Sequence, residues 1–287
     1  MEWEGLEWRT GGRMGMDAYY KDGGGWNRSD RLFDALDLKG RMGQKAKKGS
    51  GPYVISLTGG GGKTSLIRRL AWEGMEQGLK VLVTTTTHMA VPLRLGVFSC
   101  REEDVKAMLD REHAVVAGQT NGEGKISYMG DAAYHRLCAL ADLVLVEADG
   151  AKRLPLKVPR GNEPVIPDNT DLILCVSGLT AAGRLAAERC FRLETAQRVM
   201  EIHGRRDYDG GEDGQWRITL EDMGCLMRYG YLEPLRAQYP QAETIPVLNQ
   251  ADTVELARAA SGLLDEMKEE GGIAAGRLLE ETSAGLF

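Results

Sequence analysis

The chain has 287 residues, of which 43% are hydrophobic and 27% charged, and its formal net charge is −6. This length and composition suit one α/β domain, or one domain with a small appendage, and the acidic balance argues against a general nucleic-acid-binding protein. No run of about 18 apolar residues occurs, so the sequence predicts no membrane span.

The five cysteines lie far apart, and none forms a C-x-x-C pair. This spacing argues against a disulfide framework and against a zinc site. The first thirty residues lack the apolar core of a secretory signal. We therefore expect a reduced protein of the cytoplasm.

The N-terminal segment is rich in Gly, Met and Trp and has no apolar periodicity. We expect residues 1–29 to form a disordered or loosely attached tail, followed by a single nucleotide-binding domain over residues 30–287. Residues 31–38 have helical apolar spacing. Residues 39–51 are predicted to form a basic, glycine-containing linker.

Short apolar segments then alternate with helical segments. The predicted strands cover residues 53–57, 80–85, 113–118, 142–147, 171–176 and 244–249. Helical spacing follows the first strand over residues 64–78, and the longest helical segment covers residues 253–272. This alternation predicts an α/β fold with a doubly wound, mostly parallel sheet, which binds ligands beyond the carboxyl ends of its strands.

Residues 56–65 read SLTGGGGKTS and join the first predicted strand to the first predicted helix of this alternation. Glycine N–H groups and a helix start can form a concave phosphate site, with the lysine on the β- and γ-phosphates and the Thr64 hydroxyl on Mg²⁺. The alternative is a glycine hinge before an ordinary helix. The expected nucleotide contacts are Gly59, Gly60, Gly61, Gly62, Lys63, Thr64 and Ser65. The sequence thus predicts a three-layer fold of the P-loop NTPase type.

Leu57 occupies the position where the standard phosphate-loop pattern begins with glycine. The shorter pattern x-G-G-x-G-K-[ST] is similar to that of MinD-like ATPases and of the GTPases that assemble urease and hydrogenase metallocentres. Many MinD-like proteins have a lysine where this chain has Thr58. The resemblance therefore does not extend to a lysine contact across a dimer.

Two carboxylates lie at the end of the predicted strand 142–147: Glu147 is its last residue and Asp149 follows it. An acid at the end of a neighbouring strand is needed to hold Mg²⁺ or its water shell. Glu147 fits the strand-E-x-x-G form of the same subclass, with Gly150 as the glycine, and Asp149 is the competing candidate. We expect both acids, with Thr64, at the metal, and both with Lys63 in catalysis; the alternative is a solvated strand end.

The predicted strand 244–249 ends in the sequence NQAD, where GTPases carry N-K-x-D. The Asp252 carboxylate would accept the two N–H donors of guanine, and Asn249 would position the loop and the base. A site built for these donors discriminates against adenine. Gln250 replaces the usual lysine, so ATP stays the rival of GTP. The alternative is a turn in which Asp252 or Thr253 caps the last helix.

A basic, proline-bounded segment follows the two acids. Lys152, Lys157 and Arg160 are its candidate contacts for an anionic substrate, and a loop leaving the γ-phosphate side is also suited to respond to nucleotide state. The alternative is a rigid surface crossover with solvated charges.

Together these segments resemble the selenium-dependent hydroxylase accessory protein family (YqeC-type). The resemblance rests on TGGGGKTS, VLVTTTTHM, LVEADGAKRLPLKVPRGNEPVIP, SGLTAAG and VLNQAD, and covers roughly residues 31–287. It implies a nucleotide-binding protein that assists maturation of the selenium- and molybdenum-containing cofactor of selenium-dependent hydroxylases. FRLETA at residues 191–196 departs from the His-Arg-Pro-Glu-like run expected of the family.

The leading hypothesis is a slow Mg²⁺-dependent GTPase or ATPase that acts as an accessory factor in this maturation. Its expected partners are a nucleoside triphosphate and a selenium-dependent molybdenum hydroxylase or another maturation protein, with neither nucleic acid nor membrane. The alternative is a phosphoryl- or nucleotidyl-transferase acting on a small selenium- or molybdopterin-derived substrate.

Overall fold

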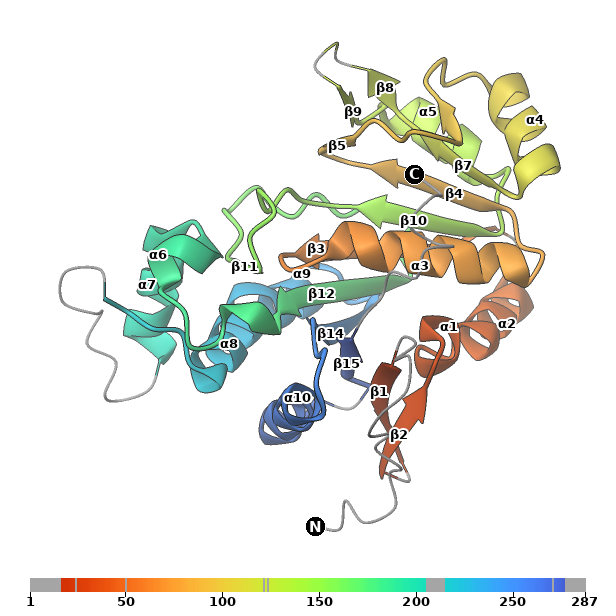
Figure 1. Cartoon of the computed structure of the whole chain (residues 1–287). Coiled ribbons are helices and arrows are strands. Elements are labelled where there is room, and N and C mark those ends of the chain that lie inside the picture. Colours follow the sequence, from red (N-terminus) through yellow and green to blue (C-terminus); the bar gives the residue numbers. More distant parts are fainter. Residues whose placement is uncertain are drawn as a thin grey trace.

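A computed structural model describes residues 17–276 of the chain, apart from 24, 50, 121, 123, 205–214 and 270 (Figure 1). Its centre is a ten-stranded sheet. The strands lie in the order β2 (Gly25–Ser29), β1 (Asp17–Asp22), β15 (Ile273–Gly276), β14 (Glu243–Asn249), β12 (Leu172–Gly178), β3 (Tyr53–Gly59), β10 (Leu143–Glu147), β4 (Val81–Thr85), β7 (Ala114–Ala117) and β6 (Gly96–Val97). All pairs from β15 to β6 are parallel, whereas β1 pairs antiparallel with both β15 and β2.

Helices cover both faces of this sheet, which gives the three layers (Figure 1). One face carries α1 (Leu32–Ala35), α2 (Leu38–Lys48) and α3 (Lys63–Glu76). The other face carries α4 (Glu102–Glu112) and α5 (Asp131–Cys138) near β7, and α8 (Leu220–Met227), α9 (Glu233–Gln238) and α10 (Val254–Glu266) near β14. The doubly wound, mostly parallel α/β fold predicted from the sequence is confirmed.

The remaining elements are short and lie around the sheet. They are β5 (His88–Ala90), β8 (Gln119–Thr120), β9 (Lys125–Ser127), β11 (Leu156–Lys157), β13 (Cys190–Phe191), the 3₁₀-helix η1 (Leu179–Ala181), α6 (Ala186–Arg189), α7 (Leu193–His203) and the π-helix η3 (Arg228–Leu232). Strands β11 and β13 pair in parallel and form a small separate sheet. This pairing places Lys157 opposite Phe191.

The central strands are buried on both faces, which explains their continuous apolar runs. In β3, Ile55 belongs to one hydrophobic core cluster, together with Leu66 of α3. The preceding residue, Val54, belongs to a second core cluster, together with Tyr134 of α5. Side chains alternate between the faces of a strand, so a strand between two helical layers favours apolar residues on both of its faces. The six predicted strands correspond to β3, β4, β7, β10, β12 and β14.

The N-terminal segment differs from the expected loose tail. Residues 17–22 and 25–29 form β1 and β2, and β1 pairs with β15 from Asp17 opposite Gly276 to Tyr20 opposite Ile273. The prediction is wrong for these residues, because pairing with a distant strand supplies the order that local apolar periodicity does not. Residues 1–16 and 277–287 lie outside the described residues, so the predicted domain bounds stay a prediction.

The predicted linker over residues 39–51 is also largely wrong, since α2 covers Leu38–Lys48. The Asp37 side chain caps this helix by accepting a hydrogen bond from the N–H of Gly40 at 3.2 Å. Lys45 of α2 forms an ion pair with Asp171. Capping and ion pairing therefore hold a helix that contains two glycines, although glycine disfavours a helix interior.

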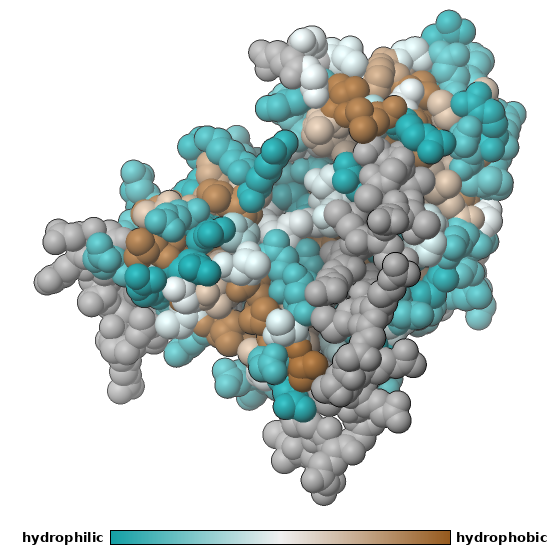
Figure 2. Space-filling model, viewed as in Figure 1, coloured by the Kyte–Doolittle hydropathy of each residue, from teal (hydrophilic) through white to brown (hydrophobic). Residues whose placement is uncertain are grey.

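Across the described ranges, no helix has both the length and the apolar character needed to cross a membrane. On the face shown in Figure 2, polar side chains are widespread and hydrophobic ones form separate patches. The parallel strands β3, β10 and β14 end at the same edge of the sheet. This edge gathers the residues of the candidate site.

Candidate functional site

The loop between β3 and α3 has a backbone that only glycine accommodates easily. Gly59, Gly61 and Gly62 have φ angles of 97°, 75° and 113°. A Cβ atom on Gly59 would lie 2.1 Å from the carbonyl oxygen of Val176, and one on Gly61 would lie 2.3 Å from the nitrogen of Gly178. The glycine run is therefore required both by the turn and by the close approach of β12.

Hydrogen bonds from the protein support this loop on three sides. The N–H of Gly60 donates to the carbonyl of Val176 at 2.9 Å, and the N–H of Gly61 donates to the carbonyl of Leu154 at 3.0 Å. The Asn249 amide donates to the carbonyl of Gly61 at 2.7 Å. The segment after β10, the end of β12 and the end of β14 thus all contact the loop.

The start of α3 offers N–H groups to an anion. The first N–H groups of any helix lack partners within that helix, and the helix dipole adds positive potential there. No side chain caps α3, because the residue before it is Gly62. This arrangement can bind phosphate oxygens.

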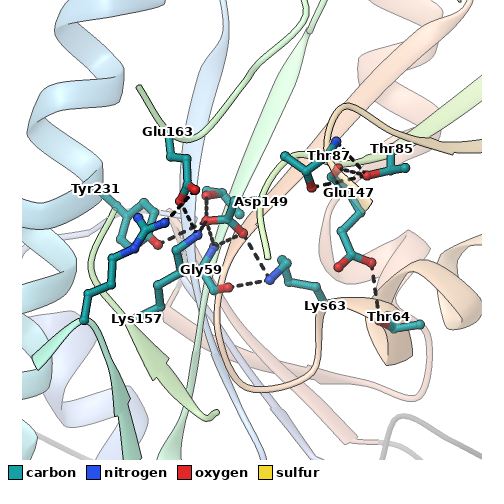
Figure 3. Close-up of polar contacts among 12 residues, drawn as sticks. Gly59, Lys63, Thr64, Thr85, Thr87, Glu147, Asp149, Lys157, Glu163 and Tyr231 are labelled. Atoms are coloured by element: carbon teal, nitrogen blue, oxygen red, sulfur yellow. Dashed lines mark hydrogen bonds and ion pairs between the residues drawn. The ribbon is translucent and has the colours of Figure 1, made fainter. Parts of the chain in front are cut away.

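Thr64 and Glu147 face each other beside the loop (Figure 3). The Thr64 hydroxyl lies 3.4 Å from Oε2 of Glu147, and the Glu147 residue is 8% exposed. Burial raises the pKa of Glu147, and the charge of Lys63 offsets only part of this rise. A hydroxyl and a carboxylate are oxygen ligands of the kind that Mg²⁺ takes alongside nucleotide phosphates. The residues present therefore fit a Mg²⁺–nucleotide, although the described residues contain no cluster of three or more acidic, His or Cys ligands.

Asp149 lies on the other side of Lys63 and has a different environment (Figure 3). It is fully buried, and its carboxylate lies 3.1 Å from the ammonium of Lys63 and 2.9 Å from that of Lys157. It also accepts hydrogen bonds from the Thr58 hydroxyl at 2.8 Å and the Tyr231 hydroxyl at 3.2 Å.

These contacts decide the charge of Asp149. Burial alone would raise its pKa, but the charges of Lys63 and Lys157 outweigh burial, so that the net shift of the pKa is downward. The N–H of Gly59 donates to the same carboxylate at 3.1 Å. Asp149 is therefore an ionised anchor for the loop, whereas Glu147 has its oxygens next to Thr64.

The three candidate substrate contacts are not equivalent. Lys152 and Arg160 are exposed. The side chain of Lys157 is fully buried and lies 2.7 Å from the Glu163 carboxylate as well as 2.9 Å from Asp149. The structure thus places Lys157 within an internal ion-pair cluster, away from solvent.

The candidate base segment follows β14. Asn249 is buried against the phosphate loop, whereas Asp252 is exposed just before α10. The Thr253 hydroxyl caps α10 by accepting from the N–H of Leu256 at 3.2 Å, so that helix is capped by Thr253. Gln250 has a φ of 66° and accepts from the Thr180 hydroxyl at 2.6 Å.

Sequence reasoning did not identify two residues that bind Asp149. Thr58 lies inside the loop motif, where many MinD-like proteins have a lysine, and this place in the motif is a usable signal. Tyr231 lies 82 positions from Asp149, in η3, and no local pattern connects the two. The hydroxyl of Thr85 is also part of the site edge, since it donates to the carbonyl of Glu147 at 2.8 Å.

Replacing Gly61 by alanine is expected to lower the free energy of unfolding by roughly 1–3 kcal/mol and to abolish any binding at the loop. The reason is the positive φ of Gly61 together with the 2.3 Å approach to Gly178. The matched control is Gly43→Ala in α2, where an added Cβ would meet nothing within 4 Å. This substitution is expected to leave the free energy of unfolding unchanged or to raise it slightly. Urea denaturation measures the free energy of unfolding of both variants. Equal changes in the two variants would contradict the prediction.

Comparison with known proteins gives a family similarity over part of the chain. A sequence model described as "YqeC protein" matches residues 55–194. The protein named "Uncharacterized protein YqeC" of Escherichia coli (strain K12) is 36% identical over 153 residues, which are 49% of this chain and 58% of that protein. The match thus spans less than two thirds of the relative's length.

Solved structures give weaker likenesses. The signal recognition particle receptor FtsY from Elizabethkingia anophelis is 14% identical, with 84% of this chain and 65% of that chain covered and a TM-score of 0.31. The hydrogenase maturation factor HypB from Archaeoglobus fulgidus is also 14% identical, with 83% and 97% covered and a TM-score of 0.27. Both TM-scores lie below 0.5, so neither likeness bears on the function of this chain.

The family match contains the glycine loop, both acids and the segment that follows them. It also contains the departure at residues 191–194. The sequence resemblance and the comparison therefore agree that residues 55–194 of the chain are similar to the YqeC family.

Proposed function

We propose that this chain binds a Mg²⁺–nucleoside triphosphate, hydrolyses it slowly and acts as an accessory factor in cofactor maturation. The observation that carries the proposal is the pairing of the Thr64 hydroxyl with Glu147 at the start of α3, directly after the glycine loop. A helix N-terminus, a lysine, a hydroxyl and an acid are the groups that phosphoryl chemistry uses for positioning.

Each of these groups would have its own role in binding and hydrolysis. The N–H groups at the start of α3 would hold phosphate oxygens, and Thr64 and Glu147 would hold Mg²⁺, which neutralises phosphate charge when bound. Lys63 would move from Asp149 to the β- and γ-phosphates. Positioning and charge neutralisation would supply the rate without a dedicated base, and turnover is therefore expected to be slow.

Guanine is the proposed base. The contact between Asn249 and Gly61 joins the end of β14 to the phosphate loop, which supports a base segment at residues 249–252. Because Thr253 caps α10, Asp252 is not needed for that cap. Its carboxylate can accept the two guanine N–H donors, which adenine does not offer. ATP is the competing base.

The role in maturation of the selenium- and molybdenum-containing cofactor is supported by the YqeC-type resemblance. The partner would be a selenium-dependent molybdenum hydroxylase or another maturation protein. Transfer of a phosphoryl or nucleotidyl group to a small anionic acceptor is the second candidate, and the exposure of Lys152 and Arg160, in the segment that follows Asp149, favours it. Lys157 would contribute to such an acceptor site only through its neighbours, because it is buried.

Binding of labelled GTP, ATP and CTP, with Mg²⁺ or with EDTA, tests the proposal. The wild-type protein is expected to bind at least one triphosphate in a Mg²⁺-dependent way, and Lys63→Ala is expected to weaken binding at least about 10-fold by removing a charge-assisted contact. Lys106→Ala, an exposed lysine of α4, is the control. Free phosphate without an acceptor supports hydrolysis, and label on added selenophosphate supports transfer. A wild-type protein that binds no triphosphate contradicts both functions.

A further inference from the structure

The phosphate-loop lysine is already engaged in this structure. Lys63 forms a hydrogen bond to the carbonyl of Gly59 and lies 3.1 Å from Asp149, and the side chains of Lys63 and Asp149 are 4% and 0% exposed. For its ammonium to reach a phosphate, Lys63 must leave Asp149. A fully buried carboxylate without a counter-ion is strongly unfavourable, so this step needs a second positive charge.

Lys157 provides that charge from the opposite side of Asp149 (Figure 3). The pairing of β11 with β13 holds its backbone opposite Phe191. Glu163 holds its side chain at 2.7 Å, and Arg192 in turn binds Glu163 at 2.6 Å. Lys157 is therefore fixed in place from both its main chain and its side chain.

The charges of this cluster balance without the phosphate-loop lysine. Asp149 and Glu163 contribute two negative charges, and Lys157 and Arg192 contribute two positive ones. Lys63 is the third cation and gives the cluster a net charge of +1. Its departure leaves the buried cluster neutral, with Asp149 still bound by Thr58, Gly59 and Tyr231.

We propose that Lys157 is a positioning residue that keeps Asp149 paired while Lys63 transfers to the phosphates of a bound nucleotide. Lys157 acts through Asp149 and touches neither the nucleotide nor the metal. The inference rests on the proposed nucleotide binding and adds to it an exchange of counter-ions at a buried acid. Without Lys157, Asp149 would retain Lys63, and the lysine would be withheld from the phosphates.

Two variants test the exchange, once wild-type binding of a Mg²⁺–triphosphate has been established. Lys157→Met is expected to weaken triphosphate binding at least about 10-fold, because Lys63 becomes the sole cation on Asp149. The double variant Asp149→Asn, Lys157→Met removes the acid that retains Lys63 and keeps the cluster at +1. Its affinity is expected to return to within about 3-fold of wild type. Lys47→Met, an exposed lysine of α2, is the control for loss of one positive charge.

The outcomes separate the exchange from a structural role. A Lys157→Met protein that binds like wild type overturns the inference, and so does a folded double variant that binds as weakly as Lys157→Met. If Lys157→Met does not fold, as circular dichroism would show, the double variant decides alone: binding near wild type supports the exchange, and binding about 10-fold weaker overturns it. If the wild-type protein binds no triphosphate, the proposed function itself has failed.

Discussion

Glu147→Gln is expected to reduce Mg²⁺-dependent triphosphate hydrolysis about 100-fold and to leave the fold intact. The Glu147 carboxylate is the acid that faces the Thr64 hydroxyl, and an amide of the same shape loses the negative charge that attracts the ion. Burial raises the pKa of Glu147, which means that its ionised form costs more free energy in the folded protein than in water. A neutral glutamine should therefore cost little stability.

Phosphate release as a function of Mg²⁺ concentration measures this prediction. The Mg²⁺ concentration at half-maximal rate is expected to rise at least about 10-fold in Glu147→Gln, since the proposed site gives the metal few protein ligands and the variant weakens one of them. Glu103→Gln, an exposed acid of α4, controls for the lost charge. If Asp149→Asn shows the shift in Mg²⁺ dependence and Glu147→Gln does not, Asp149 is the metal acid and the assignment is wrong.

The sequence predicts the location of the two acids but not their different environments. Their position at the end of an apolar strand predicts that both lie at the sheet edge beside the loop, as the structure shows. Their different environments come from contacts that no local pattern shows: Tyr231, far away in the chain, and Lys157, nearer in the chain on β11, bind Asp149, whereas the distant Thr64 lies at Glu147. Only the tertiary packing of β11 and η3 distinguishes an anchoring carboxylate from one available to a metal.

The strands of the fold likewise comprise some that the sequence predicts and some that it does not. The parallel strands are predictable because burial on both faces demands apolar runs such as that of β3. Strands β1 and β2, at one end of the sheet, carry polar and glycine residues. Their formation depends on the pairing of β1 with β15, which follows more than 240 positions later: β1 ends at residue 22 and β15 begins at residue 273. Local periodicity contains no information about such a partner.

The loop was predictable for a third reason, namely that strand, glycines and helix are contiguous in the chain. The hydrogen bond from the N–H of Gly61 to the carbonyl of Leu154 was not predictable, because it joins segments about 90 residues apart. A phosphate chain that used the Gly61 N–H would have to displace this carbonyl. Residues 151–157 therefore connect the phosphate loop to the ion-pair cluster around Asp149.

Asp252→Asn is expected to change the base that the protein prefers. Guanine presents two N–H donors to a carboxylate, and an asparagine amide can accept only one of them and places its own N–H₂ group against the other. Losing one charged hydrogen bond and leaving groups unpaired should weaken GTP binding about 100-fold. Xanthine has a carbonyl acceptor in place of the guanine amino group, so XTP binding should improve in the same variant.

Competition of GTP, ATP and XTP for one labelled triphosphate measures this change. Glu255→Gln, an exposed acid in the first turn of α10, removes the same charge near the same helix end and should leave the order of the three nucleotides unaltered. The discriminating quantity is the ratio of GTP to ATP affinity, since general weakening affects both alike. If Asp252→Asn keeps the wild-type ratio, Asp252 does not contact the base. The guanine assignment then falls, whereas the phosphate and metal contacts at Lys63, Thr64 and Glu147 stand on their own tests.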